Sequence, residues 1–235
     1  MYARFLMALA ITAVPILADV VFSDTTFSNG TYTGTTYKSD PTSTVSFGQC
    51  ATCGNPGQAM QILINLPNSF DLVGLGLTNS SFTYDPLTQG AIQSISASVD
   101  KDVIFNQAVS GGNAFHPMLE QDGVFYIATI LGPNLVNNTT TGYDTISQTG
   151  LLATDFTEYD FTTGTSGSAH PNFAGDPITF GLAQLSSLGS PVQLQVDYDN
   201  LNLDVVTTPE PSYLLILATG LFGLVILGRR NQSRA

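Results

Sequence analysis

The strongest constraint on the fold is a period-two alternation of apolar and polar residues along the interior of the chain. Residues 60–66, 95–99 and 192–198 show it clearly. Successive side chains of a β-strand point to opposite faces, so each stretch predicts a strand with one core face and one solvent face. Residues 124–131, VFYIATIL, are apolar at nearly every position and predict a central strand covered on both faces. The chain is therefore expected to be all-β.

Turn signals and composition agree with many short strands. The 235-residue chain contains 22 glycines, 12 prolines and no tryptophan, and 43% of it is hydrophobic, which is enough for a substantial core. Pairs such as Asn29-Gly30 and Asp122-Gly123 separate the apolar runs at intervals typical of a sandwich. Together these features predict a single β-sandwich domain over residues 19–206.

The last predicted strand contains a one-residue irregularity. Its apolar residues stand at positions 192, 194, 196 and 198 and then at 201, 203 and 205, so the phase slips at Asp199-Asn200. A β-bulge accommodates one extra residue in this way and re-aims the polar side chains of the sequence DYDN. Asp199 and Asn200 are therefore candidates for a ligand or cation site, and a plain corner of the sandwich is the alternative interpretation.

Calcium is the cofactor to which these residues are best suited, in a structural role. Residues 19–208 contain two cationic residues, Lys38 and Lys101, against 17 of the 18 acidic ones, a formal net charge of −15. Oxygen-rich turns on such a surface suit a hard cation, and Asp24 would join the site if the first and last strands pair. The same charge argues against binding to nucleic acid. We predict no other cofactor and no catalytic residue.

The beginning of the chain has the pattern of a secretory signal peptide over residues 1–18. One positive residue, Arg4, is followed by an apolar run at 5–17 and by the small residue Ala18. This order predicts export and cleavage before Asp19. A buried N-terminal strand or helix is the alternative.

The end of the chain predicts a transmembrane helix over residues 213–228. These 16 residues carry no charge and are followed by Arg229 and Arg230. As a helix they span about 24 Å, which is short of a hydrocarbon core of about 30 Å but within reach of bilayer thinning and arginine snorkelling. Arginines kept in the cytoplasm would place residues 19–208 outside it. A buried core helix is the alternative.

The C-terminal segment 207–235 carries a short PEP motif before this apolar run and arginines after it. This order resembles the PEP-CTERM sorting signal of Gram-negative and related environmental bacteria. The resemblance implies recognition by exosortase, a membrane protease and transpeptidase, with the helix as a temporary anchor in the inner membrane. It implies a final location at the cell surface or in an exopolysaccharide matrix. The implied sorting-signal residues are Pro209, Glu210, Pro211, Ser212, Arg229 and Arg230.

Five interior segments also resemble a jelly-roll domain found in exported PEP-CTERM proteins, related in shape to laminin-G-like and carbohydrate-binding sandwiches. The segments are 54–62, 90–100, 119–128, 170–182 and 196–205. The resemblance implies a jelly-roll β-sandwich. The function that we expect from it is non-catalytic binding of extracellular polysaccharide or surface proteins. A purely structural protein of the biofilm matrix is the first alternative.

A glycoside hydrolase is the second alternative, and it depends on the sequence TDFTEYD at 154–160. If this segment is extended, Glu158 and Asp160 project from one face about 7 Å apart, within the range of paired-carboxylate glycosidases. Asp155 adds a third acid, but the order of acids departs from the Glu, Asp, Glu signature of jelly-roll glycosidases. An acidic, solvated loop is the alternative interpretation.

Cys50 and Cys53 are the only cysteines, and a C-x-x-C pair in an exported chain predicts a small disulfide. A thioredoxin-like redox site would need a βαβ context, and a zinc site would need two further ligands, for which His116 and His170 are the available histidines. Both histidines precede proline, a pair that is typical of an extended residue entering a turn.

Overall fold

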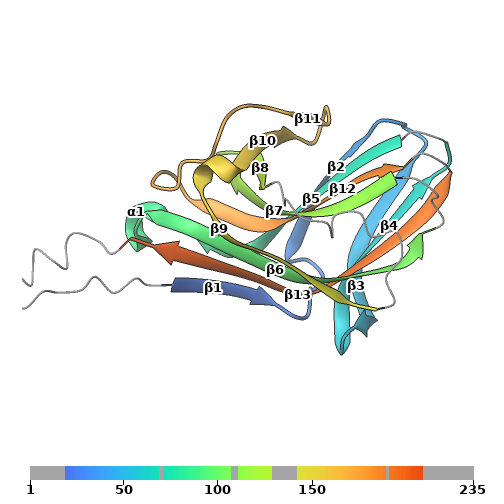
Figure 1. Ribbon diagram of the computed structural model, residues 1–235, viewed down its shortest axis with the longest axis horizontal. Helices are drawn as coiled ribbons and strands as arrows, with labels where there is room; N and C mark the ends of the chain where they lie inside the picture. The colour runs from blue at the N-terminus through green and yellow to red at the C-terminus, as the bar shows by residue number, and fades with distance from the viewer. Residues whose placement is uncertain (1–18, 69–70, 107–110, 129–141, 189–190, 209–235) are drawn as a thin grey trace, which may run out of the picture.

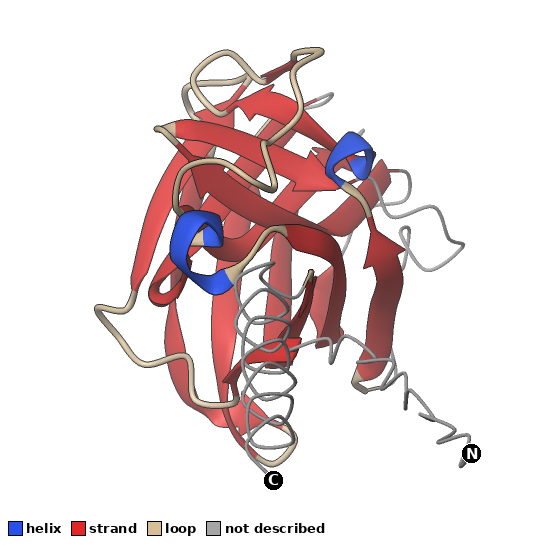
Figure 2. Cartoon of the chain, turned by 90° about the vertical axis from the view of Figure 1, so that its left-hand side faces the viewer, coloured by secondary structure: helices blue, strands red, loops and turns tan. Residues whose placement is uncertain are grey.

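The computed structural model describes residues 19–68, 71–106, 111–128, 142–188 and 191–208. Two antiparallel β-sheets pack face to face (Figure 1), and the helices are short beside the strands (Figure 2). The predicted all-β sandwich is therefore confirmed. The predicted signal peptide at 1–18 and the predicted membrane helix at 213–228 lie outside the described residues. Within the described ranges no helix is long and apolar enough to cross a membrane.

Sheet A has six strands and is organised around the longest strand of the chain. Its strands are β1 (Asp19–Asp24), β3 (Thr44–Gly54), β4 (Gly57–Leu66), β6 (Ile92–Asn106), β9 (Asp144–Leu151) and β13 (Val192–Thr207). The order is β3-β4-β13-β6-β9, and β1 also pairs with β13. One edge of β13 is covered first by β4 and then by β1, while β6 runs along the other edge. The first and last strands pair, with Asp19 opposite Val206, which was the condition for placing Asp24 in the calcium site.

Sheet B has seven strands in the order β11-β10-β8-β7-β12-β5-β2. They are β2 (Tyr32–Lys38), β5 (Asp71–Tyr84), β7 (Gly111–Gln121), β8 (Val124–Ala128), β10 (Phe156–Asp160), β11 (Thr165–Ser166) and β12 (Ile178–Leu188). A short helix, α1 (Pro86–Gln89), follows β5, and a 3-10 turn, η2 (Ala153–Asp155), precedes β10. Strand β8 lies between β7 and β10, with Tyr126 and Ala128 in the main core and Ile127 in a second cluster on the other face. The prediction of a strand covered on both faces is confirmed for residues 124–128.

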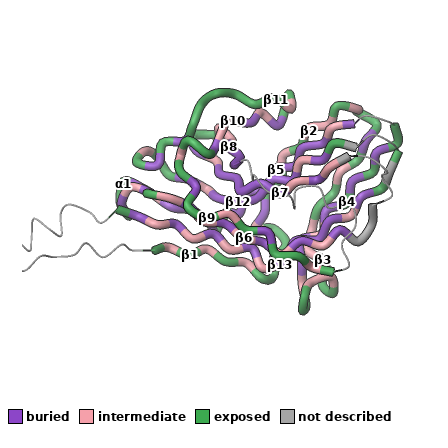
Figure 3. Tube along the Cα trace, in the orientation of Figure 1, coloured by how far each residue is buried: buried purple, intermediate pink, exposed green. Residues whose placement is uncertain are grey.

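Buried residues recur along the strands of both sheets (Figure 3), and most of their apolar side chains form one core cluster. The predicted phase slip in β13 is confirmed as a β-bulge. The pairing between β13 and β6 shifts between Asp199 and Asn202, and Asn200 adopts a left-handed conformation with a φ of 51°. Both halves of β13 therefore turn their apolar side chains toward the core. The buried core-facing residues on either side of the bulge are Leu194, Val196, Tyr198, Leu201, Leu203 and Val205.

The outer face of sheet B is partly covered by the chain itself. After β10, Phe161 packs with Met118, Ile127, Tyr159 and Ala183 in the second apolar cluster. The glycines of β5 make room for it, since a Cβ atom at Gly76 would stand 2.8 Å from the Phe161 ring. This part of the face is therefore a small core and does not offer an open binding surface.

We predict that Asn200→Ala destabilises the domain by about 1 kcal/mol more than Asn200→Gly does, because only glycine adopts the left-handed conformation without strain. Both variants lose the same hydrogen bond, from Asn200 Nδ2 to Asp100 Oδ2 at 2.7 Å. The glycine variant is therefore the matched control for the alanine variant. Chemical denaturation measures the difference, and equal free energies of unfolding would contradict the assigned role of the bulge.

Candidate functional site: a carboxamide-lined groove on sheet A

Three neighbouring strands of sheet A, β3, β4 and β13, place two rows of side chains on the outer face of the sheet. Within each row the residues are cross-strand partners, so their side chains stand side by side. The first row consists of Thr44, Asn65 and Gln193, and the second consists of Ser46, Leu63 and Gln195. The rows are about 7 Å apart along the strands, and each crosses about 10 Å of the sheet.

These two rows line a groove of about 390 Å³, together with Ile64 and Leu194, whose side chains are buried in the core. None of the described residues that line the groove is charged. Three carboxamides and two hydroxyls supply both hydrogen-bond donors and acceptors. Leu63 adds an apolar surface, since its side chain is 43% exposed.

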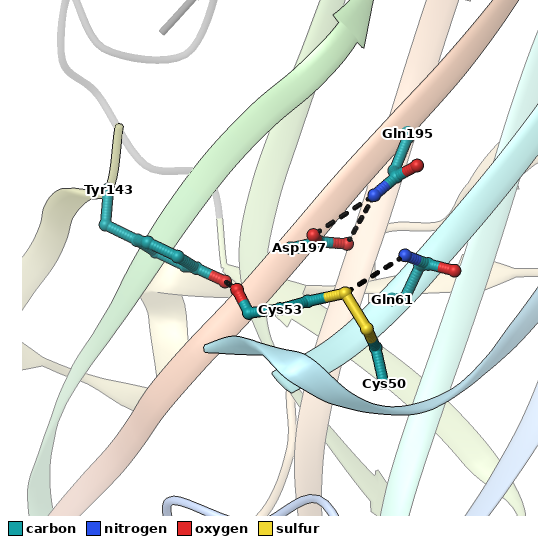
Figure 4. The surroundings of a disulfide bond; sticks show 6 residues. All are labelled: Cys50, Cys53, Gln61, Tyr143, Gln195 and Asp197. Atoms are coloured by element: carbon teal, nitrogen blue, oxygen red, sulfur yellow. Dashed lines mark hydrogen bonds between the residues drawn. A yellow bond between two sulfur atoms is a disulfide. The ribbon is translucent and has the colours of Figure 1, made fainter. Parts of the chain in front are cut away.

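A buried carboxylate fixes the orientation of one groove residue. Gln195 Nε2 donates to both oxygens of Asp197, at 3.3 and 3.2 Å (Figure 4). Asp197 lies two residues further along β13 and is fully buried. Burial raises the pKa of Asp197 to about 6, although hydrogen bonds from Gln195 and Gln61 act in the opposite direction. The Gln195 carboxamide is therefore held by one end, and its oxygen points away from Asp197.

The predicted disulfide between Cys50 and Cys53 is confirmed, and it lies beside this carboxylate (Figure 4). Gln61 Nε2 donates to Cys53 Sγ at 3.4 Å, and the Tyr143 hydroxyl donates to the Cys53 carbonyl oxygen at 2.5 Å. The end of β3 is thus fastened to sheet A. Gln61 is the cross-strand partner of Asp197, so the disulfide lies next to the row of residues that follows the groove.

Both histidines bind backbone carbonyls. His116 Nδ1 lies 2.6 Å from the carbonyl oxygen of Ala128, and His170 Nδ1 lies 2.7 Å from that of Phe156. His116 is extended within β7, as expected for a residue before proline, but it does not enter a turn. Burial lowers the pKa of His116. The pairing of the cysteines with each other leaves no thiolate for the zinc alternative.

Two of the three calcium candidates, Asp199 and Asn200, are sequence neighbours at the bulge, and their side chains bind different partners. Asp199 is buried on the outer face and accepts hydrogen bonds from the backbone N–H groups of Asn55 and Asn200, both at 2.7 Å. The amide of Asn200 donates to Asp100, on the neighbouring strand β6.

Asp24 lies on the other face of sheet A. It is opposite Leu201, a core-facing residue, and its carboxylate accepts from the backbone N–H groups of Thr26 and Phe27. No cluster of three or more metal-ligating side chains occurs in the part of the chain that the structure describes. Calcium binding stays a prediction from the sequence.

The acids considered for a glycosidase hold local turns. Asp160 accepts from the backbone N–H and the hydroxyl of Thr162, and these hydrogen bonds lower the pKa of Asp160. Asp155 accepts from the backbone N–H of Leu152 at 2.8 Å. Glu158 lies on β10 between them. A glycosidase needs one carboxyl group with a raised pKa as its general acid, so the shift at Asp160 does not favour that alternative.

Sequence reasoning did not identify the groove, although it placed Leu63, Asn65, Gln193 and Gln195 on solvent faces. The signal that could have found it is Leu63, an apolar residue at a solvent-facing position of an alternating strand. The register that aligns β4 with β3 and β13 cannot be read from the alternation alone.

No protein-family model matches this chain, and no match was found among curated proteins. Among solved structures the chain is similar to the family 11 carbohydrate-binding module of Clostridium thermocellum in complex with a β-1,3-1,4-mixed-linked tetrasaccharide. That similarity has a TM-score of 0.46 and 10% identity and covers 82% of this chain and 97% of the module.

Two further similarities are of the same kind. The CBM22-1 xylan-binding domain of Paenibacillus barcinonensis has a TM-score of 0.38 and 11% identity, over 83% of this chain and 99% of the domain. CBM27-1 of Caldicellulosiruptor saccharolyticus, in complex with mannohexaose, has a TM-score of 0.41 and 14% identity, over 82% of this chain and 98% of the module. Similarities this weak identify no family and assign no ligand to the chain.

We predict that Asp197→Asn is more stable than the wild type above neutral pH and loses this advantage as the pH falls from about 7 to about 4. The folded-state pKa of about 6 exceeds the ordinary value of 3.8, so the folded protein binds a proton that the unfolded chain has released. The wild type therefore gains up to about 3 kcal/mol relative to the variant over this interval. Melting temperatures of both proteins, measured side by side across this range, test the prediction. A difference that does not change with pH would contradict it.

Proposed function

We propose that this chain is a non-catalytic binding protein whose groove on sheet A holds a segment of a neutral polysaccharide. The observation that supports the proposal is the uncharged lining, in which three carboxamides and two hydroxyls surround the exposed side chain of Leu63. Sugar hydroxyls both donate and accept hydrogen bonds, as carboxamides do. The C–H face of a sugar ring can pack on Leu63, where burial of apolar surface contributes to binding.

The size and shape of the groove suit a ligand that lies along the sheet. Its volume of about 390 Å³ falls at the lower end of the range for small-molecule sites, about 300 to 1,000 Å³. The groove is lined by residues of three adjacent strands, β3, β4 and β13, and crosses the outer face of sheet A. A few sugar rings of a longer chain fit this description better than an enclosed metabolite does.

Pre-organisation of Gln195 favours binding. A free glutamine side chain loses rotamer freedom when it binds a ligand, and that loss lowers affinity. Here the hydrogen bonds to Asp197 have already fixed the carboxamide. The oxygen of Gln195 is then available as an acceptor at a defined position.

The charge of the domain selects among polysaccharides. A net charge of −15 over residues 19–208 repels polyanionic chains, so neutral polysaccharides are the expected class. The jelly-roll form of the sandwich, export by a signal peptide and sorting by an exosortase to the surface or matrix belong to the same proposal. They are supported by the order of segments in the sequence, above all by the PEP motif, apolar run and arginines at 207–235.

Binding of the full-length chain in detergent to an array of neutral and acidic polysaccharides tests the proposal. We expect retention on a neutral polysaccharide and about a three- to tenfold weaker Kd for Gln193→Ala, which removes one hydrogen-bonding side chain. Leu63→Asp should abolish binding, because it places a charge in the apolar centre of the groove.

Gln93→Ala is the matched control, since Gln93 is an exposed carboxamide on β6 outside the groove. Its affinity should equal that of the wild type. Binding to none of the neutral polysaccharides would overturn the proposal and favour a purely structural protein. Release of sugar fragments would show that the protein is an enzyme.

A further inference from the structure

A group of polar side chains lies inside the apolar sandwich, between the two sheets. Lys101 of β6 is 2% exposed and Asn113 of β7 is 0% exposed. Tyr198, the cross-strand partner of Lys101, donates its hydroxyl hydrogen to Gln184 Oε1. Gln184 Nε2 in turn donates to Ser186, which lies opposite Asn113. Sheets A and B are therefore joined by polar contacts in their interior.

Lys101 and Asn113 make the most unusual of these contacts. Lys101 Nζ donates to the side-chain oxygen of Asn113 and, at 3.0 Å, to its backbone oxygen. A lysine is almost never fully buried unless it is paired with an acid. The partner of Lys101 is a neutral carboxamide, and the contact spans from one sheet to the other.

The environment makes Lys101 a nucleophile at neutral pH. Burial lowers the pKa of Lys101 to about 7. At neutral pH the Lys101 amine is therefore unprotonated in a large fraction of the protein molecules. A desolvated lysine of this kind is a typical nucleophile toward carbonyl carbon. The carboxamide carbon of Asn113 is the atom next to the oxygen that Nζ contacts.

We infer that Lys101 and Asn113 join in an intramolecular isopeptide bond that links sheet A to sheet B. The lone pair of Nζ attacks Cγ of Asn113, the Nζ–Cγ bond forms, and the Cγ–Nδ2 bond breaks. One proton passes from Nζ to Nδ2, which leaves as ammonia. The reaction needs no oxidant, reductant or cofactor. The fixed contact between the amine and the amide raises their effective concentration, and the dry interior excludes competing hydrolysis.

The intact mass of the denatured full-length protein tests the bond, and it is independent of any ligand in the groove. The measured mass of the wild type should be lower than the mass calculated from its sequence by one ammonia. Lys101→Met keeps the length of the side chain and removes the amine, so its measured mass should equal the mass calculated from its own sequence. Because both proteins have the same N-terminus, processing cancels in the comparison. A wild type without the deficit would overturn the inference.

Trypsin digestion of the denatured protein locates the bond. Trypsin cuts after a lysine only when the side-chain amine is free. The peptide bond between Lys101 and Asp102 should therefore resist cleavage. Lys38 is the only other lysine of the chain and provides an internal control, since the bond after it should be cut completely. A lost ammonia with complete cleavage after Lys101 would indicate cyclisation of Asn113 onto its own backbone, and it would overturn the isopeptide bond.

Discussion

The extra residue at Asn200 decides which side chains the centre of sheet A turns inward. β13 is paired along both edges, so it cannot slide to correct a wrong phase. Without the bulge, the second half of the strand would turn Leu201 and its apolar successors toward solvent. With it, both halves reach the core while Gln195, Asp197 and Asp199 stay on the outer face. The groove and its orienting carboxylate therefore depend on one residue in a left-handed conformation.

The two outer faces of the sandwich differ because their residues differ in size and polarity. Sheet B presents Gly74 and Gly76 to its outer side, and the chain fills that space with Phe161. Sheet A presents carboxamides and hydroxyls, which gain nothing from being covered by an aromatic ring. Polar side chains on an outer face can hydrogen-bond to water when no ligand is bound, so an open groove leaves no polar group without a partner.

The sequence was sufficient to predict features that depend on neighbouring residues. The alternation predicted the strands, the phase slip predicted the bulge, and the spacing of Cys50 and Cys53 predicted the disulfide. The groove could not be predicted in this way, because it depends on pairing between residues near 45, 64 and 194. Lys101 shows a different limit. The alternation of Ile95, Ala97 and Val99 predicts that Lys101 faces the core, whereas its charge predicts exposure to solvent. The structure buries Lys101 against the carboxamide of Asn113 on the opposite sheet, a contact that the local sequence does not reveal.

The pairing of β1 with the end of β13 has a mechanical consequence. Asp19 lies opposite Val206, so the two ends of the described domain lie side by side. Gln195 lies near the other end of β13, about 35 Å from Val206 at 3.3 Å per residue. A polymer held in the groove and an attachment beyond residue 208 would then pull on opposite ends of the same strand. The load would act along β13 in shear, and the hydrogen-bonded ladders on both of its edges would bear it together.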